Sequence, residues 1–255
     1  MRITRFKSQD NLSHYGWIDE DRIGIIQGDP FGEYRRFEAK QRLTEVILLP
    51  PCLPTKIISV DQNYFARIRE KGIPIPEYPV LLLKPPSSII SSGQAVIIPP
   101  QSQQVEHGAE LAVIVGKKSR WLSEKEVRSV IFGYTIANNV TARDLLAQDD
   151  QWTRAKGFDT FCPLGPWIET DFNPADSIIS CTVNSTMRQM ASTRDMIFTI
   201  EQLLMFISSI MTLMPGDVIL TGSPAGVGPL EAGDTVTINI EGIGNLLNTV
   251  EAFSG

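Results

Sequence analysis

Two acidic residues and a histidine lie beside one strongly apolar stretch of the chain. Residues 105–115 read Val-Glu-His-Gly-Ala-Glu-Leu-Ala-Val-Ile-Val, which places Glu106, His107 and Glu110 just before the apolar run 111–115. A short continuous apolar run is consistent with a buried strand. Because a rigid strand can hold carboxylates at the wall of a pocket, we expect the chemistry of this protein to be centred on Glu110. His107 is expected to be a hydrogen-bonded packing residue rather than a base.

Polar residues also follow two further apolar runs. Residues 57–60 lead into Asp61, Asn63 and Tyr64, and a later apolar run leads into Thr-Gly-Ser-Pro-Ala-Gly-Val-Gly at 221–228. The amides and hydroxyls of such a glycine-rich turn can receive an anion. A Walker phosphate loop is excluded because the Gly-Lys-Ser/Thr ending is missing. A dinucleotide fingerprint is excluded by the glycine spacing and by the lack of a following helical pattern.

The composition restricts the class of partner. The chain has 255 residues and a net charge of −6, which argues against nucleic acid or an anionic membrane, because both require a positively charged surface. A small molecule is the expected partner. The three cysteines, Cys52, Cys162 and Cys181, are widely spaced, so we expect buried free thiols rather than disulfides or a zinc site. Neither a signal peptide nor a membrane-spanning run is recognisable, and we expect a cytoplasmic protein.

The patterns predict a mixed α/β chain that is mainly β. Residues 1–54 alternate short strand-like runs with turns, apart from a short helix expected around 43–48, and end in prolines. They are predicted to form a small β-rich N-terminal domain. Residues 55–255 are predicted to form a second, larger domain.

Three helices are expected in the larger domain. Residues 65–71 should form one or two turns that Gly72 ends. The pair Ser123 and Glu126 has the spacing of a capping box, which predicts a helix start. The apolar face of residues 198–213 predicts the longest helix.

A set of short motifs, taken in order along the chain, closely resembles the fumarylacetoacetate hydrolase family. The motifs are Asn63-Tyr64, Leu83-Lys84-Pro85-Pro86-Ser87-Ser88, Ala109-Glu110-Leu111-Ala112-Val113, Gly133-Tyr134-Thr135, Val140-Thr141-Ala142-Arg143-Asp144, Lys156-Gly157-Phe158-Asp159, Pro163-Leu164-Gly165-Pro166-Trp167 and Pro215-Gly216-Asp217 through Gly228. The resemblance implies a mixed β-roll catalytic domain. The residues before it resemble the small N-terminal domain of the bacterial 2-hydroxyhepta-2,4-diene-1,7-dioate isomerases. The family resemblance also implies a homodimer that acts on 2-oxo or 1,3-dicarbonyl acids by hydrolysis, decarboxylation or tautomerisation.

The resemblance further implies a divalent metal, magnesium or manganese, held by three carboxylates. Two of them come from a Glu-x-Glu pair, which here reads Gly108-Ala109-Glu110, and the third is an Asp whose position is Asn139 here. With two anionic ligands replaced, we expect the metal to be weakly bound or lost. Asp61 or Glu106 could supply a new carboxylate. Alternatively, basic residues could hold an acidic substrate and stabilise an enolate without metal.

Matching positions give the expected roles. Lys156, Glu70 and Arg67 are the predicted catalytic residues, and Arg67 stands where the family usually has a histidine. The predicted substrate-binding residues are Asn63, Tyr64, Lys84, Thr221, Gly222 and Ser223. Each has a plainer alternative. Lys156 could be a surface lysine, Arg67 a solvated helix residue, Glu110 a structural carboxylate, Tyr64 a core residue and the 221–223 segment a turn former.

Two functions from different classes remain at this point. The first is an enzyme of the family that acts on a 2-oxo or diketo dicarboxylic acid with an altered, metal-poor site. The second is a catalytically silent homologue that serves as a binding or scaffolding subunit.

Overall fold

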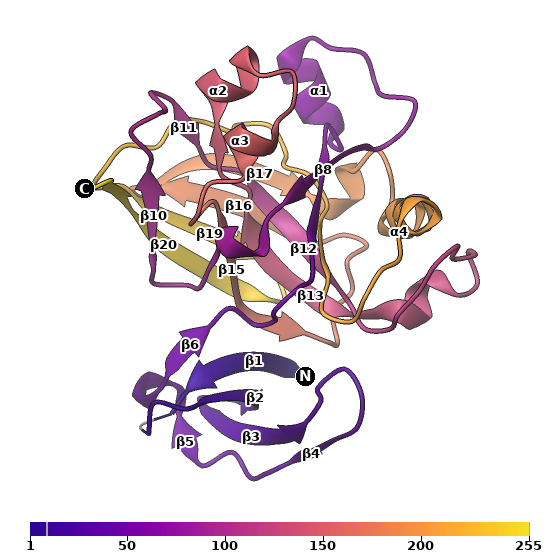
Figure 1. Ribbon diagram of the computed structural model, residues 1–255, viewed down its shortest axis with the longest axis vertical. Coiled ribbons are helices and arrows are strands. Elements are labelled where there is room, and N and C mark those ends of the chain that lie inside the picture. The colour runs from indigo at the N-terminus through magenta and orange to yellow at the C-terminus, as the bar shows by residue number, and fades with distance from the viewer. Residues whose placement is uncertain (9, 255) are drawn as a thin grey trace.

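The computed structural model describes residues 1–8 and 10–254. Strands contain more of these residues than helices do, and the expectation of a mixed, mainly β chain is confirmed. The strands form a sheet of 13 strands, a sheet of five and a pair. Figure 1 shows the N-terminal strands below the remainder of the chain.

The N-terminal strands form one end of the large sheet. They bury Phe6, Ile18 and Ile23 among themselves. β1 joins them to the rest of the sheet by pairing with β15, where Arg2 faces Glu169. The elements are β1 (Arg2–Lys7), β2 (Ser13–Asp19), β3 (Arg22–Gly28), β4 (Tyr34–Arg36), β5 (Gln41–Arg42), the 3-10 turn η1 (Leu43–Glu45) and β6 (Ile47–Leu49).

The helix expected around residues 43–48 does not form beyond the single turn η1. Residues 47–49 instead pair with β1, Leu49 facing Arg5. This apolar run therefore completes the ladder of a neighbouring strand, which local sequence alone does not reveal. We propose that the boundary between the two parts of the chain lies near residue 54.

The remaining strands of the large sheet carry the predicted site. In order across the sheet they run β15, β13, β12, β18, β7, β8, and β12 is buried along its whole length, as predicted for the strand that bears Glu110. Their bounds are β7 (Ile57–Asp61), β8 (Val80–Lys84), β12 (Ala109–Val115), β13 (Ile131–Asn138), β15 (Cys162–Glu169) and β18 (Val218–Leu220), with β9 (Ile89–Ile90) attached to β15.

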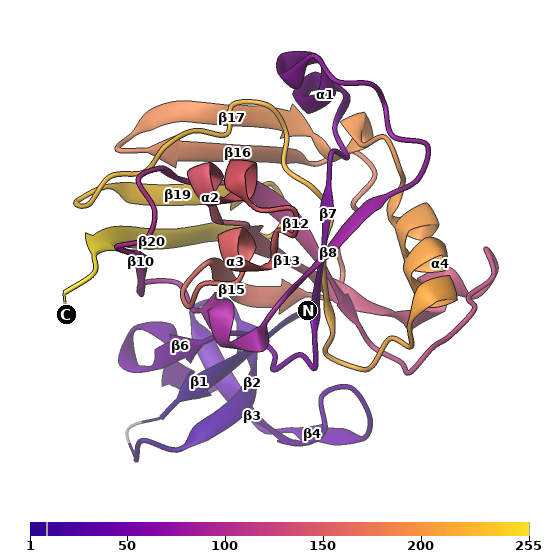
Figure 2. The same ribbon diagram turned by 45° about the horizontal axis from the view of Figure 1, so that its top comes forward.

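The five-stranded sheet packs against this part of the large sheet. Figure 2 shows β17, β16, β19 and β20 side by side, and β16 and β17 form an antiparallel hairpin. The main apolar core lies between the layers and joins Val113 of β12, Ile238 of β19 and Leu204. The strands are β10 (Ala95–Ile98), β16 (Ile178–Val183), β17 (Thr186–Ser192), β19 (Thr235–Ile240) and β20 (Gly244–Ala252), and β11 (Val105–Glu106) pairs with β14 (Thr141–Ala142).

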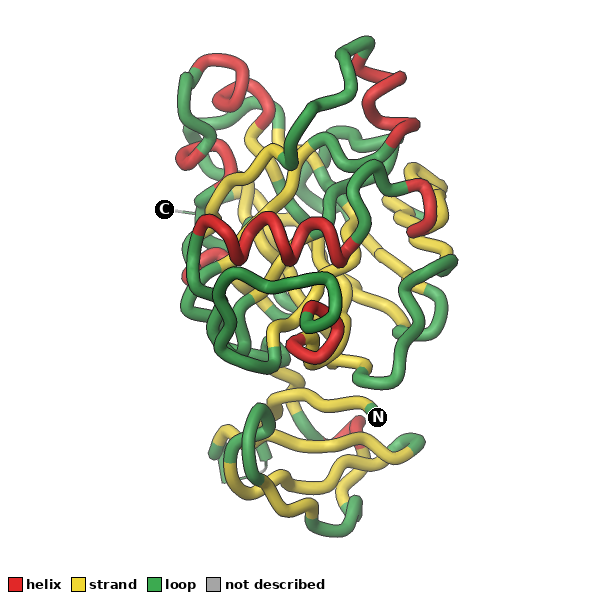
Figure 3. Tube along the Cα trace, turned by 90° about the vertical axis from the view of Figure 1, so that its right-hand side faces the viewer, coloured by secondary structure: helices red, strands yellow, loops and turns green. Residues whose placement is uncertain are grey.

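Helices are few and short. α1 (Phe65–Lys71) ends at Gly72 in the left-handed conformation, as predicted. α4 (Ile200–Ile210) begins with a capping box between Thr199 and Gln202, and Figure 3 shows it lying across the strands. The others are α2 (Arg143–Gln148), α3 (Thr153–Lys156) and the 3-10 turns η2 (Pro86–Ser88), η3 (Val127–Val130) and η4 (Thr193–Asp195). No helix in the described ranges is long and apolar enough to cross a membrane.

Two helix predictions need correction. The side chains of Ser123 and Glu126 do form a hydrogen bond, but only the 3-10 turn η3 follows, because the chain enters β13 at Ile131. The longest helix ends at residue 210 rather than 213. Leu213 is extended instead and forms a bridge with Ser119.

The three cysteines generate a prediction about reactivity. All three are free and buried, and burial raises the pKa of Cys52 to about 12, of Cys162 to about 11 and of Cys181 to about 12. A raised pKa keeps the thiol protonated at pH 8, whereas the thiolate is the reactive form. Labelling with a disulfide reagent should therefore be slow in the native protein and reach three thiols per chain in denaturant. Rapid labelling of the native protein would contradict this burial.

Candidate functional site

Glu110 lies at the centre of the site and is only 1% exposed. Its carboxylate accepts three hydrogen bonds. One oxygen accepts the amide N–H of Gly222 at 2.8 Å, and the other accepts Nδ2 of Asn139 at 2.7 Å and the Ser223 hydroxyl at 2.9 Å. The glycine-rich turn was predicted to receive an anion, and the anion that it binds here is this internal carboxylate.

Asn139 links Glu110 to a lysine. Its Nδ2 also donates to the Ser59 hydroxyl at 2.8 Å, while its Oδ1 accepts from Nζ of Lys156 at 3.1 Å. The partners fix the orientation of the amide, because a flipped amide would set its oxygen against the Glu110 carboxylate and its NH2 group against the Lys156 ammonium. The Asn139 side chain therefore connects Glu110 to Lys156 through two hydrogen bonds.

Burial opposes charge on both ends of this chain. Burial raises the pKa of Glu110, and the Lys156 ammonium and the three hydrogen bonds oppose that rise. Burial lowers the pKa of Lys156 to about 8, while Asp61 and Glu110 oppose that fall. In both groups desolvation outweighs attraction to the nearby opposite charge. Lys156 is thus a buried residue of the site and not the surface lysine of the plainer alternative.

Lys84 lies behind Lys156. Its ammonium donates to the backbone carbonyls of Val140, at 3.3 Å, and Lys156. Burial, and next the charge of Lys156, lower the pKa of Lys84 to about 7. The Lys84 side chain is therefore hydrogen-bonded to the backbone of Lys156 and to that of Val140, the residue after Asn139.

Asp61 lies at the more open side of the site. Its side chain is 27% exposed and its nearest cation is Nζ of Lys71, at 3.6 Å. Burial would raise its pKa, but the charges of Lys71, Lys156 and Arg143 hold it below its ordinary value. Arg143 also pairs with Glu106 at 2.7 Å. Three basic side chains therefore surround one carboxylate next to the Glu110 network.

Helix α1 covers this region. Arg67 and Glu70 form an ion pair within the helix, and Glu70 also accepts the amide N–H of Gly226 at 3.0 Å. The Arg67 side chain is only 11% exposed, and after burial its charge is among the influences that lower the pKa of His107. Arg67 is therefore turned inward, and Glu70 fastens the helix to the glycine-rich turn.

Asn63, Tyr64 and Thr221 support the site from within the core. Asn63 is fully buried and bonds to the backbone of Phe198 and, at 2.8 Å, to the carbonyl of Thr221. The Thr221 hydroxyl donates to the carbonyl of Leu111 at 2.9 Å. Tyr64 is a fully buried core residue whose hydroxyl has no partner among the described residues. These three residues fix the shape of the site.

His107 is the buried, hydrogen-bonded residue that was expected. Its Nδ1 lies 3.1 Å from the side-chain oxygen of Gln189 and 3.5 Å from Sγ of Cys181. Burial lowers its pKa. The neutral ring therefore packs beneath the glycine-rich turn, where its backbone N–H donates to the carbonyl of Gly228.

Comparisons with known proteins agree with this geometry. Residues 56–251 match the family model described as fumarylacetoacetate (FAA) hydrolase C-terminal, and residues 1–51 match one described as Rv2993c-like, N-terminal. The chain belongs to the fumarylacetoacetate hydrolase family.

Named relatives include isomerases and a hydrolase. The structure of 2-hydroxyhepta-2,4-diene-1,7-dioate isomerase from Mycobacterium marinum is 40% identical, with a TM-score of 0.91 and full coverage of both chains. The human mitochondrial oxaloacetate tautomerase FAHD2B is 40% identical over 81% of this chain and 70% of its own length. The maleylpyruvate hydrolase of Sphingobium sp. SYK-6, seen with manganese(II) and pyruvate, is 30% identical over both full chains, with a TM-score of 0.82.

The metal that this family implies does not fit the residues present. Glu110 is the one carboxylate of the expected set, and an amide hydrogen of Asn139 points at its oxygen, where a cation would need a lone pair. At Gly108 an added Cβ would lie 2.6 Å from the Ser223 hydroxyl. Among residues 1–8 and 10–254, no group of three or more His, Cys, Asp or Glu side chains could hold a metal ion.

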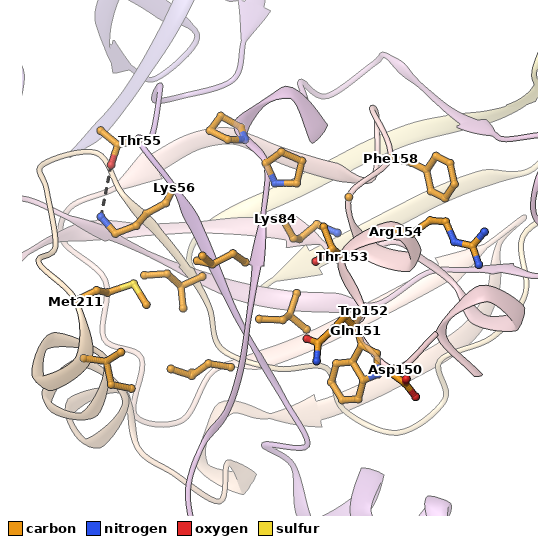
Figure 4. A pocket seen from close by; sticks show the side chains of 18 residues that line it. Thr55, Lys56, Lys84, Asp150, Gln151, Trp152, Thr153, Arg154, Phe158 and Met211 are labelled. Atoms are coloured by element: carbon orange, nitrogen blue, oxygen red, sulfur yellow. Dashed lines mark hydrogen bonds between the residues drawn. The ribbon is translucent and has the colours of Figure 1, made fainter. Parts of the chain in front are cut away.

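A large cavity lies beside this network without containing it. Its volume is about 1130 Å3, and it runs along β8 between residues 150–158 and the end of α4. Figure 4 shows Lys84 in its wall, near Thr153 and Trp152. Glu110, Asn139 and Asp61 do not line it. Lys84 thus contacts both this cavity and the backbone of Lys156.

Sequence reasoning missed three contributors. Ser59 is a polar residue inside the buried strand β7, and that interruption of an apolar run was an available signal. Arg143 lies within a quoted motif but was given no role. Lys71 follows Arg67 by four residues on α1, so that both share one helix face. The helical spacing, read together with Asp61, could have identified Lys71.

We predict that Glu110→Ala destabilises the protein by about 3 kcal/mol, because it leaves three buried donors without their acceptor and removes the negative charge near Lys156. The measurement is urea unfolding at pH 7, with the exposed Glu126→Ala as the matched control. A loss as small as that of the control would mean that the network contributes little to stability.

Proposed function

We propose that this protein isomerises a small 2-oxo or diketo dicarboxylic acid between its keto and enol forms, without a bound divalent metal. The isomerase and tautomerase relatives support this reaction over hydrolysis or decarboxylation. The residue that replaces the family's usual histidine also supports isomerisation. Arg67 cannot act as a base to activate water, since a guanidinium stays protonated, and isomerisation needs no water molecule.

The fixed Lys156 ammonium is the observation that carries this proposal. It is buried, its hydrogen bond to Asn139 orients it, and it lies near Asp61. A preorganised cation in a site that excludes water stabilises a developing enolate far better than one in solution. Arg67, Lys71 and Arg143 provide further positive charge for the carboxylates of a dicarboxylic acid.

The reaction then requires one base and one cation. We propose that the Asp61 carboxylate removes a proton from the carbon next to the keto group. The electron pair of that C–H bond forms the C=C bond, and the carbonyl oxygen becomes an enolate oxygen facing Lys156. A proton returned to this oxygen completes the enol, so the step consumes no cofactor. The homodimeric state that the family resemblance implies stays part of this proposal.

A specific observation also favours the second candidate, a silent homologue that binds without turnover. The Glu110 carboxylate already accepts three hydrogen bonds from the protein, and Arg67 is paired with Glu70. Groups satisfied within the protein have less capacity to engage a substrate. Under this alternative the network is structural and the protein serves as a partner subunit.

We predict that the wild-type protein tautomerises oxaloacetate in the presence of EDTA. Lys156→Met should lower the rate by at least about 100-fold, the magnitude of losing one oriented donor to an oxyanion. Enol absorbance follows the reaction, and the exposed Lys40→Met is the matched control. Loss of wild-type activity in EDTA would contradict the metal-free mechanism. No turnover of any 2-oxo dicarboxylic acid would favour the silent homologue.

We also predict that a metal site can be restored. Gly108→Glu and Asn139→Asp return the two missing carboxylates, and Ser223→Ala removes the hydroxyl that an added side chain at 108 would meet. Calorimetric titration with manganese should show binding by this triple variant, little binding by Asn139→Asp alone and none by the parent. Tight binding by the parent would mean that Glu110 can exchange its protein donors for an ion.

A further inference from the structure

A second cavity of about 620 Å3 lies apart from the candidate site. It opens between the start of β13, the loop 170–175 that follows β15, and the segment that leads from η4 into α4. Glu110, Asn139 and Lys156 do not line it. Of the two ends of β13, the N-terminal end faces this cavity, whereas the C-terminal end leads into Asn139.

Aromatic rings form much of its wall. Phe132, Tyr134 and Phe172 all line the cavity, and the rings of Tyr134 and Phe172 meet at 59° with their centroids 5.2 Å apart. Met196 and Ile200 add aliphatic surface. Aromatic and aliphatic side chains of this kind are common in the walls of small-molecule sites, where neighbouring polar groups fix the orientation of the ligand.

The charged side chains in the lining carry a net positive charge. Tyr134 is 8% exposed, and its hydroxyl makes no hydrogen bond within the described chain. Burial raises its pKa to about 12, so the hydroxyl remains a donor. Arg128 and Arg194 also line the cavity, together with a single carboxylate, that of Glu201, which pairs with Arg128 at 2.9 Å.

Arg194 also forms ion pairs with two carboxylates that do not line the cavity. Its guanidinium pairs with Asp176 at 3.3 Å and with Asp195 at 3.9 Å, and all three side chains are largely solvent-exposed. Exposed pairs of this kind are weak. Both arginines can therefore turn towards an additional anion at small cost.

We propose that this cavity binds a small aromatic monocarboxylate. The ring lies against Phe132 and Phe172, and the carboxylate accepts the Tyr134 hydroxyl and an N–H of Arg128. Such a ligand gives an acceptor to the Tyr134 hydroxyl, and its single negative charge matches the net charge of the lining.

The cavity shares a wall with the candidate site. Met196, which lines the cavity, forms a backbone bridge with Tyr64. The backbone N–H of Phe198 donates to the side-chain oxygen of Asn63, and the Phe198 carbonyl accepts from the side-chain nitrogen of Asn63. Thr199, the next residue, again lines the cavity. A ligand that presses on residues 196–199 therefore acts on the backbone that fixes Asn63.

Titration of the full chain with benzoate tests the proposal. By calorimetry we expect saturable binding that Tyr134→Phe weakens about fivefold, the effect of losing one hydrogen bond to a charged group. Tyr34→Phe, at an exposed tyrosine, is the matched control and should leave binding unchanged. Ala175→Trp fills the cavity from its exposed loop and should abolish binding, with thermal unfolding confirming that this variant folds.

Two further measurements complete the test. Benzylamine, which carries the opposite charge, should not bind, and in nuclear magnetic resonance spectra benzoate should shift the side-chain amide signals of Asn63. No saturable benzoate binding, or binding that neither Tyr134→Phe nor Ala175→Trp changes, would overturn the proposal. Binding without any shift at Asn63 would overturn the link to the candidate site.

Discussion

The burial of the Glu110 carboxylate is the constraint on which the rest of the site depends. A carboxylate held away from water is stable only if its oxygens are hydrogen-bonded and a positive charge lies nearby. Three distant parts of the chain meet that demand. The turn after β18 brings Gly222 and Ser223, the end of β13 brings Asn139, and α3 brings Lys156. The strand β12 that bears Glu110 lies between β13 and β18, so the sheet order itself brings Asn139, Gly222 and Ser223 to Glu110.

The same constraint explains why local changes in this site are linked. A glycine at 108 leaves room for the Ser223 hydroxyl, because a Cβ there would approach it to 2.6 Å. The hydroxyl in turn supplies one of the hydrogen bonds that Glu110 needs. An amide at 139 can donate to Glu110 and accept from Lys156, which a carboxylate at the same place could not do. Gly108, Asn139 and Ser223 therefore form one self-consistent set.

Sequence reasoning found what is encoded locally and missed what depends on distant contacts. The apolar run of β12 and the helix α1 ended by Gly72 could be predicted because neighbouring residues determine them. The Ser123 cap was also recognised, but strand pairing at Ile131 cut the helix short. Lys84 illustrates the limit for side chains. A motif resemblance predicted that Lys84 binds substrate, which stays a prediction, whereas its contacts to two carbonyls follow only from where α3 packs on β8.

Charge balance favours continued activity over silence. Three carboxylates around a divalent cation, as the family resemblance implies, sum to one negative charge, and Glu110 alone carries that same charge. The net charge near Lys156 is therefore the same in the two arrangements: the one with a divalent ion and three carboxylates, and the one with Glu110 alone. The proposed reaction does without the Lewis acid, while Arg67 adds a cation where a histidine is usual. Since Coulomb interactions act on the summed charge at these short distances, the lysine can retain its part in stabilising an enolate although the ligand set around it differs.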